Sequence, residues 1–118
     1  MKFYEDPTYI EMCRGAGEIQ EQCPDIDDAK SFWIDIENNP YNHNIWLPRL
    51  DQLIDMLDES VSKEYKTPYY KIWEFYEYAM VKTEPHGDWT TEQVMIQFVM
   101  YKKYRKEWDF DKKQWVKI

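Results

Sequence analysis

The chain has 118 residues, of which 43% are hydrophobic and 18% aromatic, and it carries a formal net charge of −8. This length suits one domain with one core, and disordered chains are poor in aromatic residues. The sequence lacks an apolar run of about 18 residues and an export signal, which excludes a membrane-spanning helix and indicates an intracellular, reduced protein.

The first predicted helix begins at Asp6 and Pro7. Asp is a preferred N-cap residue, and proline suits the first helical position. The helix is expected to end before Pro24, although Gly15 and Gly17 each weaken it by roughly 1 kcal/mol relative to alanine.

One strand is predicted after this helix. Residues 32–36 are rich in β-forming side chains and precede the turn signal Asn38-Asn39-Pro40. Residues 115–118 have a similar character, so we expect a small two-stranded sheet that pairs them with 32–36.

The second predicted helix begins near Pro48 and has two contrasting faces. Four apolar residues fall on one face, as expected for a helix that packs on a core: Leu50, Leu53, Ile54 and Leu57. Another face carries Asp51, Asp55 and Asp58, whose spacing brings like charges together. Such a stripe is either simply solvated or used for binding.

Two further helices complete the predicted fold. Thr67 and Pro68 open the third, whose wide apolar surface predicts a central position. Thr90 and Gln93 form a capping-box pair at the start of the fourth, which is expected to extend its core face to Trp108. The predicted fold is mainly α (α+β), with about four helices and a small two-stranded β element in a single compact domain, residues 1–118.

Motifs for catalysis, metals and cofactors are missing from the sequence. His43 and His86 lie in a polar loop and a turn without a catalytic motif around them. Cys13 and Cys23 lack zinc-site spacing and are interpreted as small buried thiols. We therefore predict no catalytic residues, no metal and no cofactor.

Charge is unevenly distributed along the chain. Residues 1–60 contain 4 Lys/Arg and 14 Asp/Glu, whereas residues 61–118 contain 11 and 9. The basic cluster 102–106 alternates with tyrosines, as in single-strand binders, but the overall negative charge disfavours direct nucleic-acid binding. The acidic half indicates either solubility alone or a basic protein partner.

Three groups of motifs resemble those of small phage and prophage proteins from Gram-positive hosts. They lie in residues 4–20, in Ile45–Leu53, and in Thr90–Trp108, and they leave about 59–88 uncovered. The chain departs from the group's pattern at Leu50, where glutamine is expected, and at 25–30, where a Gly-Asp turn is expected. No activity is attached to this group. The resemblance implies a phage accessory protein in the bacterial cytoplasm, and such proteins are often inhibitors of host enzymes or host defence.

The first functional hypothesis is therefore a non-catalytic protein that binds and inhibits a host protein. Its acidic face is expected to imitate phosphate spacing against a basic groove, so that salt weakens binding. The residues of this face are Asp35, Glu37, Asp51, Asp55, Asp58 and Glu59.

Other functions stay open. One alternative is a sponge for a nucleotide signal, in which aromatic rings stack on the base and two cations meet phosphate. The residues of this site are Trp33, Tyr41, Trp46, Arg49, Lys71, Trp73 and Tyr76. Another alternative is a structural homo-oligomer, and a homodimer is compatible with either binding function. An enzyme ranks below these.

Overall fold

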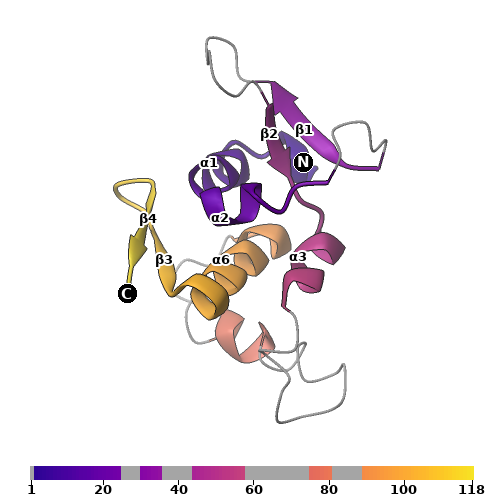
Figure 1. Cartoon of the computed structure of the whole chain (residues 1–118). Coiled ribbons are helices and arrows are strands. Elements are labelled where there is room, and N and C mark those ends of the chain that lie inside the picture. Colours follow the sequence, from indigo (N-terminus) through magenta and orange to yellow (C-terminus); the bar gives the residue numbers. More distant parts are fainter. Residues whose placement is uncertain (1, 25–29, 36–43, 58–74, 81–88) are drawn as a thin grey trace.

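Helices form most of the described structure, and two small antiparallel sheets lie at separate margins (Figure 1). The computed structural model describes residues 2–24, 30–35, 44–57, 75–80 and 89–118. Within them, no helix combines the length and apolarity that a bilayer crossing requires. The elements are η1 (Phe3–Glu5), α1 (Pro7–Gly15), α2 (Gly17–Gln20), β1 (Phe32–Asp35), β2 (Asn44–Leu47), α3 (Leu50–Met56), α6 (Thr91–Tyr104), β3 (Lys106–Asp109) and β4 (Gln114–Lys117), and residues 75–80 are also helical.

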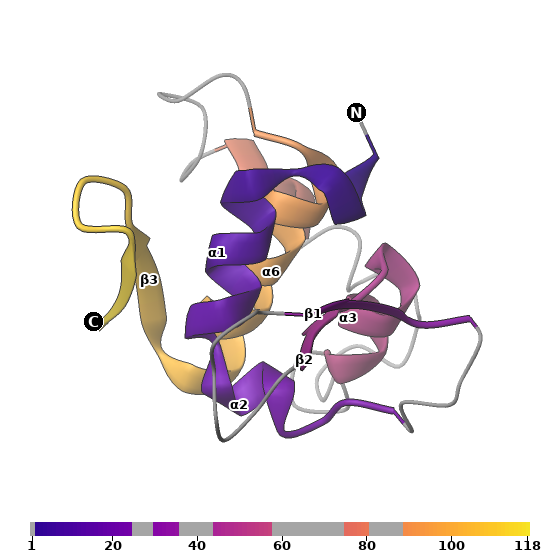
Figure 2. The same ribbon diagram turned by 90° about the horizontal axis from the view of Figure 1, so that it is seen from above.

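The central element is α6, which packs against α1, α3 and β3 (Figure 2). Every residue from Gln93 to Met100 is buried, so this helix has no solvent face over two turns. The predicted capping box is confirmed, because Thr90 Oγ1 accepts from the Gln93 amide at 3.2 Å and Gln93 Oε1 accepts from the Thr90 amide at 2.9 Å. The sequence predicts a central position for the third helix. In its described part, residues 75–80, Tyr76 and Met80 are exposed, so α6 takes that position instead.

The first helix is shorter than predicted. Asp6 caps α1 as expected, with its carboxylate accepting from the Thr8 amide at 3.0 Å. The chain then breaks at Ala16 (φ −93°, ψ 72°) and resumes as α2. Glycines on both sides of Ala16 lower the cost of leaving the helical conformation. The break sets α2 off from α1 and directs the chain toward β2.

The mainly helical class with minor β structure is confirmed, but the predicted strand pairing is wrong. β1 pairs with β2 in the register Trp33–Trp46, and β3 pairs with β4 in the register Trp108–Trp115. Both pairings join segments close in sequence, so they cost less loop-closure entropy than pairing residues 32–36 with 115–118. Trp108, expected on a helix, lies on β3 because α6 ends at Tyr104 and Arg105 adopts a left-handed conformation (φ 55°).

The side chain of Gln20 fastens α2 to β2. Its Nε2 donates to the Trp46 carbonyl at 2.8 Å and to the Cys13 carbonyl at 3.1 Å, and its Oε1 accepts from the Trp46 amide at 2.9 Å. The amide group thus occupies the edge of β2 opposite β1, as a neighbouring strand would. Tyr9 adds a buried hydrogen bond from its hydroxyl to the Pro48 carbonyl at 2.7 Å. Burial raises the pKa of Tyr9, which keeps the hydroxyl protonated as a donor.

We predict that Gln20→Ala destabilises the protein by about 2–3 kcal/mol, because the amide and carbonyl of Trp46 lose their partner and the Cys13 carbonyl keeps only the Ala16 amide. Gln22→Ala is the matched control, since Gln22 donates only to the exposed Tyr104 hydroxyl, and it should cost about 0.5 kcal/mol or less. Urea denaturation of both variants measures the difference. Equal midpoints for the two variants would contradict the role of Gln20.

The β3–β4 hairpin is fastened to α1 by Trp115. Its Nε1 donates to the Met12 carbonyl at 2.9 Å, and its ring meets that of Trp108 edge-on at 5.1 Å. A Cβ added at Gly15 would lie 3.2 Å from Cδ1 of Trp115. Glycine at this position therefore permits the close approach of the indole ring, which the Met12 bond holds in place.

We predict opposite outcomes for alanine at the two glycines that flank Ala16. Gly17→Ala should stabilise by up to about 1 kcal/mol, because Gly17 has nothing within 4 Å of an added Cβ and alanine favours helix. Gly15→Ala should be at least about 1 kcal/mol less stable than Gly17→Ala, because its methyl group presses on Trp115. Thermal unfolding measures the stability of both variants. An equal rise in melting temperature would contradict the prediction, because it would show that the indole ring moves aside at no cost.

Candidate functional site

The exposed face of α3 carries two carboxylates one turn apart. Asp51 and Asp55 are exposed, while Leu53 and Leu57 are buried against the core, as the sequence pattern predicts; Met56 is buried as well. Packing of α3 on α6 fixes which side of the helix faces out. The side chains of both aspartates therefore lie on the surface whichever function they serve.

The two carboxylates differ in their surroundings. Arg49 pairs with Asp51 through Nε at 2.9 Å, and this hydrogen bond lowers the pKa of Asp51. Arg49 also donates from Nη1 to the Lys30 carbonyl. Asp55 forms no ion pair within 4.0 Å with any other residue that the structure describes. The negative charge of this face is therefore least compensated at Asp55.

A groove of about 260 Å³ lies beside Asp55. Trp46 lines it with an indole that is 2% exposed and whose Nε1 has no hydrogen-bond partner within the described part of the chain. The lining of the groove thus includes Asp55, from the predicted acidic face, and Trp46, from the predicted nucleotide site. Its lining residues are Gln22, Pro24, Trp46, Gln52, Asp55 and Met56. We call it the α3 groove.

The remaining predicted residues do not gather at one place in the described structure. Trp33 is half-buried opposite Trp46, and Asp35 ends β1. Tyr76 is 57% exposed in residues 75–80, which lie away from β1 and β2 (Figures 1 and 2). Of the residues predicted to bind a nucleotide, Trp46 is buried and Arg49 pairs with Asp51. Glu37, Tyr41, Asp58, Glu59, Lys71 and Trp73 lie outside the described residues.

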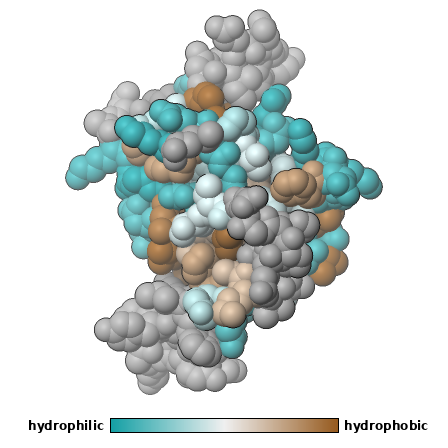
Figure 3. Space-filling view, turned by 180° about the vertical axis from the view of Figure 1, so that it is seen from behind, coloured by the Kyte–Doolittle hydropathy of each residue, from teal (hydrophilic) through white to brown (hydrophobic). Residues whose placement is uncertain are grey.

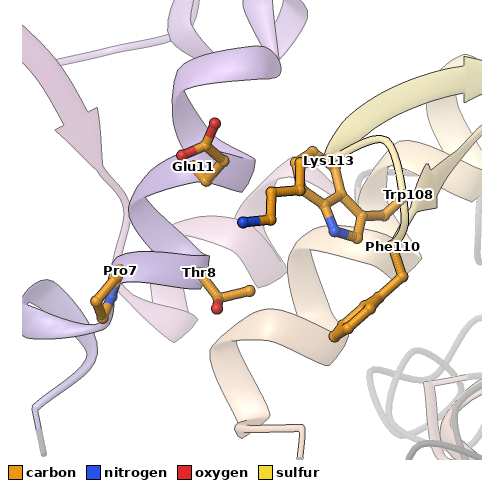
Figure 4. Close-up of a pocket in the computed structure, with 6 residues that line it drawn as sticks. All are labelled: Pro7, Thr8, Glu11, Trp108, Phe110 and Lys113. Atoms are coloured by element: carbon orange, nitrogen blue, oxygen red, sulfur yellow. The ribbon is translucent and has the colours of Figure 1, made fainter.

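A second groove, about 330 Å³ in volume, separates the first turns of α1 from the tip of the β3–β4 hairpin (Figure 4). We call it the hairpin groove. Pro7, Thr8 and Glu11 form one wall, and Trp108, Phe110 and Lys113 form the other. Sequence reasoning missed this groove because its walls come from opposite ends of the chain. Asp109 is a local signal for the hairpin turn, because its carboxylate accepts from the amides of Asp111 and Lys112 at 3.0 Å.

The many aromatic side chains contribute mainly to the interior of the described structure. Most described rings are buried or packed against the core, such as the stacked pair Tyr4 and Phe32 at 4.6 Å. Tyr76 and Phe110 are the two described rings that are more than half exposed. On the face in Figure 3, hydrophilic side chains dominate the upper part and hydrophobic ones reach the surface lower down. A ring at the surface is thus the exception, and Phe110 lines a groove.

The two thiols differ in exposure. Cys13 is buried, as expected, and burial raises its pKa, whereas Cys23 is exposed, which corrects the expectation of two buried thiols. The described residues contain no group of three or more side chains suited to hold a metal ion. His43 and His86 lie outside the described residues.

We predict that a thiol reagent labels one cysteine per native chain and two per denatured chain. Cys23 reacts because it is exposed, and Cys13 stays protonated and inaccessible. Iodoacetamide labelling followed by peptide mapping identifies the site, and Cys23→Ser should abolish native labelling. Modification of Cys13 in the native protein would contradict its burial.

Comparison of the chain with known proteins finds no matching family model, no matching curated protein and no matching solved structure. The chemistry of the two grooves is therefore the basis from which a function is inferred. The α3 groove has an uncompensated carboxylate at its edge, and the hairpin groove has charges of both signs.

Proposed function

We propose that the protein is a non-catalytic, phage-encoded accessory protein that binds and inhibits a protein of its bacterial host. The proposed target is a factor in defence or in nucleic-acid handling. The supporting observation is Asp55, an exposed carboxylate without an ion-pair partner in the described chain, which lies at a groove lined by a buried tryptophan.

The α3 groove suits a lysine or arginine side chain of such a target. The stem of a long basic side chain packs on apolar surface while its charged end stays near water. The half-buried Pro24 supplies apolar surface above the buried Trp46 and Met56, and Asp55 supplies a carboxylate for the charged end. One inserted side chain would therefore meet both the shape and the charge of the groove.

The charge of the first half supports a basic target over a nucleic acid. A negative field attracts basic protein surfaces and repels phosphate backbones. A factor that handles nucleic acid has a basic groove of its own, which an acidic protein can cover. The carboxylate of Asp55, rather than the paired Asp51, is the centre of the proposed contact.

We predict that Asp55→Lys weakens binding of the host target at least about tenfold, because it places like charges in contact. The immobilised protein is incubated with host lysate, and retained proteins are quantified by mass spectrometry at low and high salt. Asp55→Asn should have a smaller effect in the same direction. Asp111→Asn is the matched control, since it removes an exposed carboxylate from the hairpin turn and should retain the target fully.

Two further measurements test whether the retained host protein binds at the α3 groove. Cys23 lies between Gln22 and Pro24 of the α3 groove, so target binding should slow its alkylation. The purified target should lose activity with wild-type protein and keep it with Asp55→Lys. The proposal fails if no stoichiometric target is retained, or if Asp55→Lys retains and inhibits it as well as the wild type does.

A further inference from the structure

The hairpin groove is a built feature of the fold because its two walls are fixed to each other. Trp115 holds the hairpin against Met12 and the end of α1 through the 2.9 Å bond and the close contact at Gly15. This contact does not extend to the first turns of α1 and the hairpin tip. The hollow of about 330 Å³ lies between those two segments (Figure 4).

The two walls carry opposite charges. Glu11 extends from α1, and Lys113 reaches from the hairpin turn toward α1, between Glu11 and Thr8 in Figure 4. Neither side chain forms an ion pair within 4.0 Å with another residue of the described ranges. Both charges are therefore available to a ligand that lies between them.

The hairpin turn fixes the position of Lys113. The Asp109 carboxylate accepts from the amides of Asp111 and Lys112 at 3.0 Å, and Lys113 follows with φ 54°. Lysine rarely adopts this left-handed conformation, and the turn holds the backbone of Lys113 at the rim of the groove.

Apolar side chains line the groove beside the two charges. Trp108 is half-buried against Trp115, and Phe110 is 53% exposed with one edge on the Trp89 ring at 5.1 Å. Pro7 faces them from α1. A ligand in this groove therefore meets a cation, an anion and aromatic surface within one small volume.

We propose that the hairpin groove binds a free α-amino acid with a large apolar side chain. Its carboxylate pairs with Lys113, its ammonium group pairs with Glu11, and its side chain packs on Trp108 and Phe110. The volume corresponds to roughly eleven water molecules at about 30 Å³ each, which suits one large amino acid. This site is separate from the α3 groove, and its occupancy does not require a host protein.

The test is a titration of the isolated protein with L-phenylalanine, followed by two-dimensional NMR of the backbone amides. Saturable shifts are expected at Thr8, Glu11 and Phe110. Lys113→Met and Glu11→Gln should each weaken binding about tenfold, because each removes one charge-assisted contact. Lys113→Arg should restore binding, since it keeps the cation.

Two analogues assign each charge to its partner. L-phenylalaninamide lacks the carboxylate, so Lys113→Met should not weaken its binding further. N-acetyl-L-phenylalanine lacks the ammonium group, so Glu11→Gln should not weaken its binding further. Lys112→Met and Glu21→Gln are controls of matched chemistry outside the groove and should bind L-phenylalanine like the wild type.

The amino-acid site and the proposed function can fail independently of each other. Asp55→Lys should bind L-phenylalanine normally even though it loses the host target. The absence of saturable shifts up to the solubility limit of L-phenylalanine would overturn the proposal. Equal losses for the amino acid and both analogues in either variant would also overturn it, because they would show that the charges do not act on the ligand.

Discussion

The fold depends on the amide group of one side chain, Gln20. A short helix and a strand have no regular hydrogen bonds to each other, and Gln20 supplies them by bonding both backbone groups of Trp46 and the Cys13 carbonyl. This places the indole of Trp46 at the base of the α3 groove. The break of the first helix at Ala16 is part of the same arrangement, because an unbroken helix would carry Gln20 in another direction. The hydrogen bonds of Gln20 thus hold α2 against β2 and also position the tryptophan of the α3 groove.

The signals that sequence analysis read correctly are contained within a few residues. Asp6 and Pro7 specify a helix start, Thr90 and Gln93 satisfy each other's backbone groups, and the aspartates of α3 oppose its leucines. Each depends on local geometry that is the same in any fold. Exposure of Asp55 could therefore be predicted, while its groove could not, because Gln22, Pro24 and Trp46 approach it only after folding.

The helix predicted through Arg105 is wrong because contacts with another segment outweigh the local preference. Arginine is a good helix former, and a left-handed conformation costs about 1–2 kcal/mol, so the sequence favoured a helix continuing through Arg105. The structure ends the helix there because the Ile118 amide bonds the Arg105 carbonyl at 3.0 Å and Trp108 meets Trp115 across the hairpin. Likewise, Trp115 and α1 lie almost a whole chain apart in sequence, so no periodicity could reveal the hairpin groove between them.

The two grooves differ in how charge acts in them, which allows one small chain to carry both. A carboxylate without a counter-charge projects a field that draws basic partners from beyond contact, within a Debye length of about 8 Å at physiological salt. Opposed charges such as Glu11 and Lys113 largely cancel at a distance and act on a ligand only once it lies between them. This difference suits the two proposed roles, in which the α3 groove captures a large basic partner and the hairpin groove selects among small zwitterions. The two grooves share no lining residue, so we expect substitutions in them to act independently.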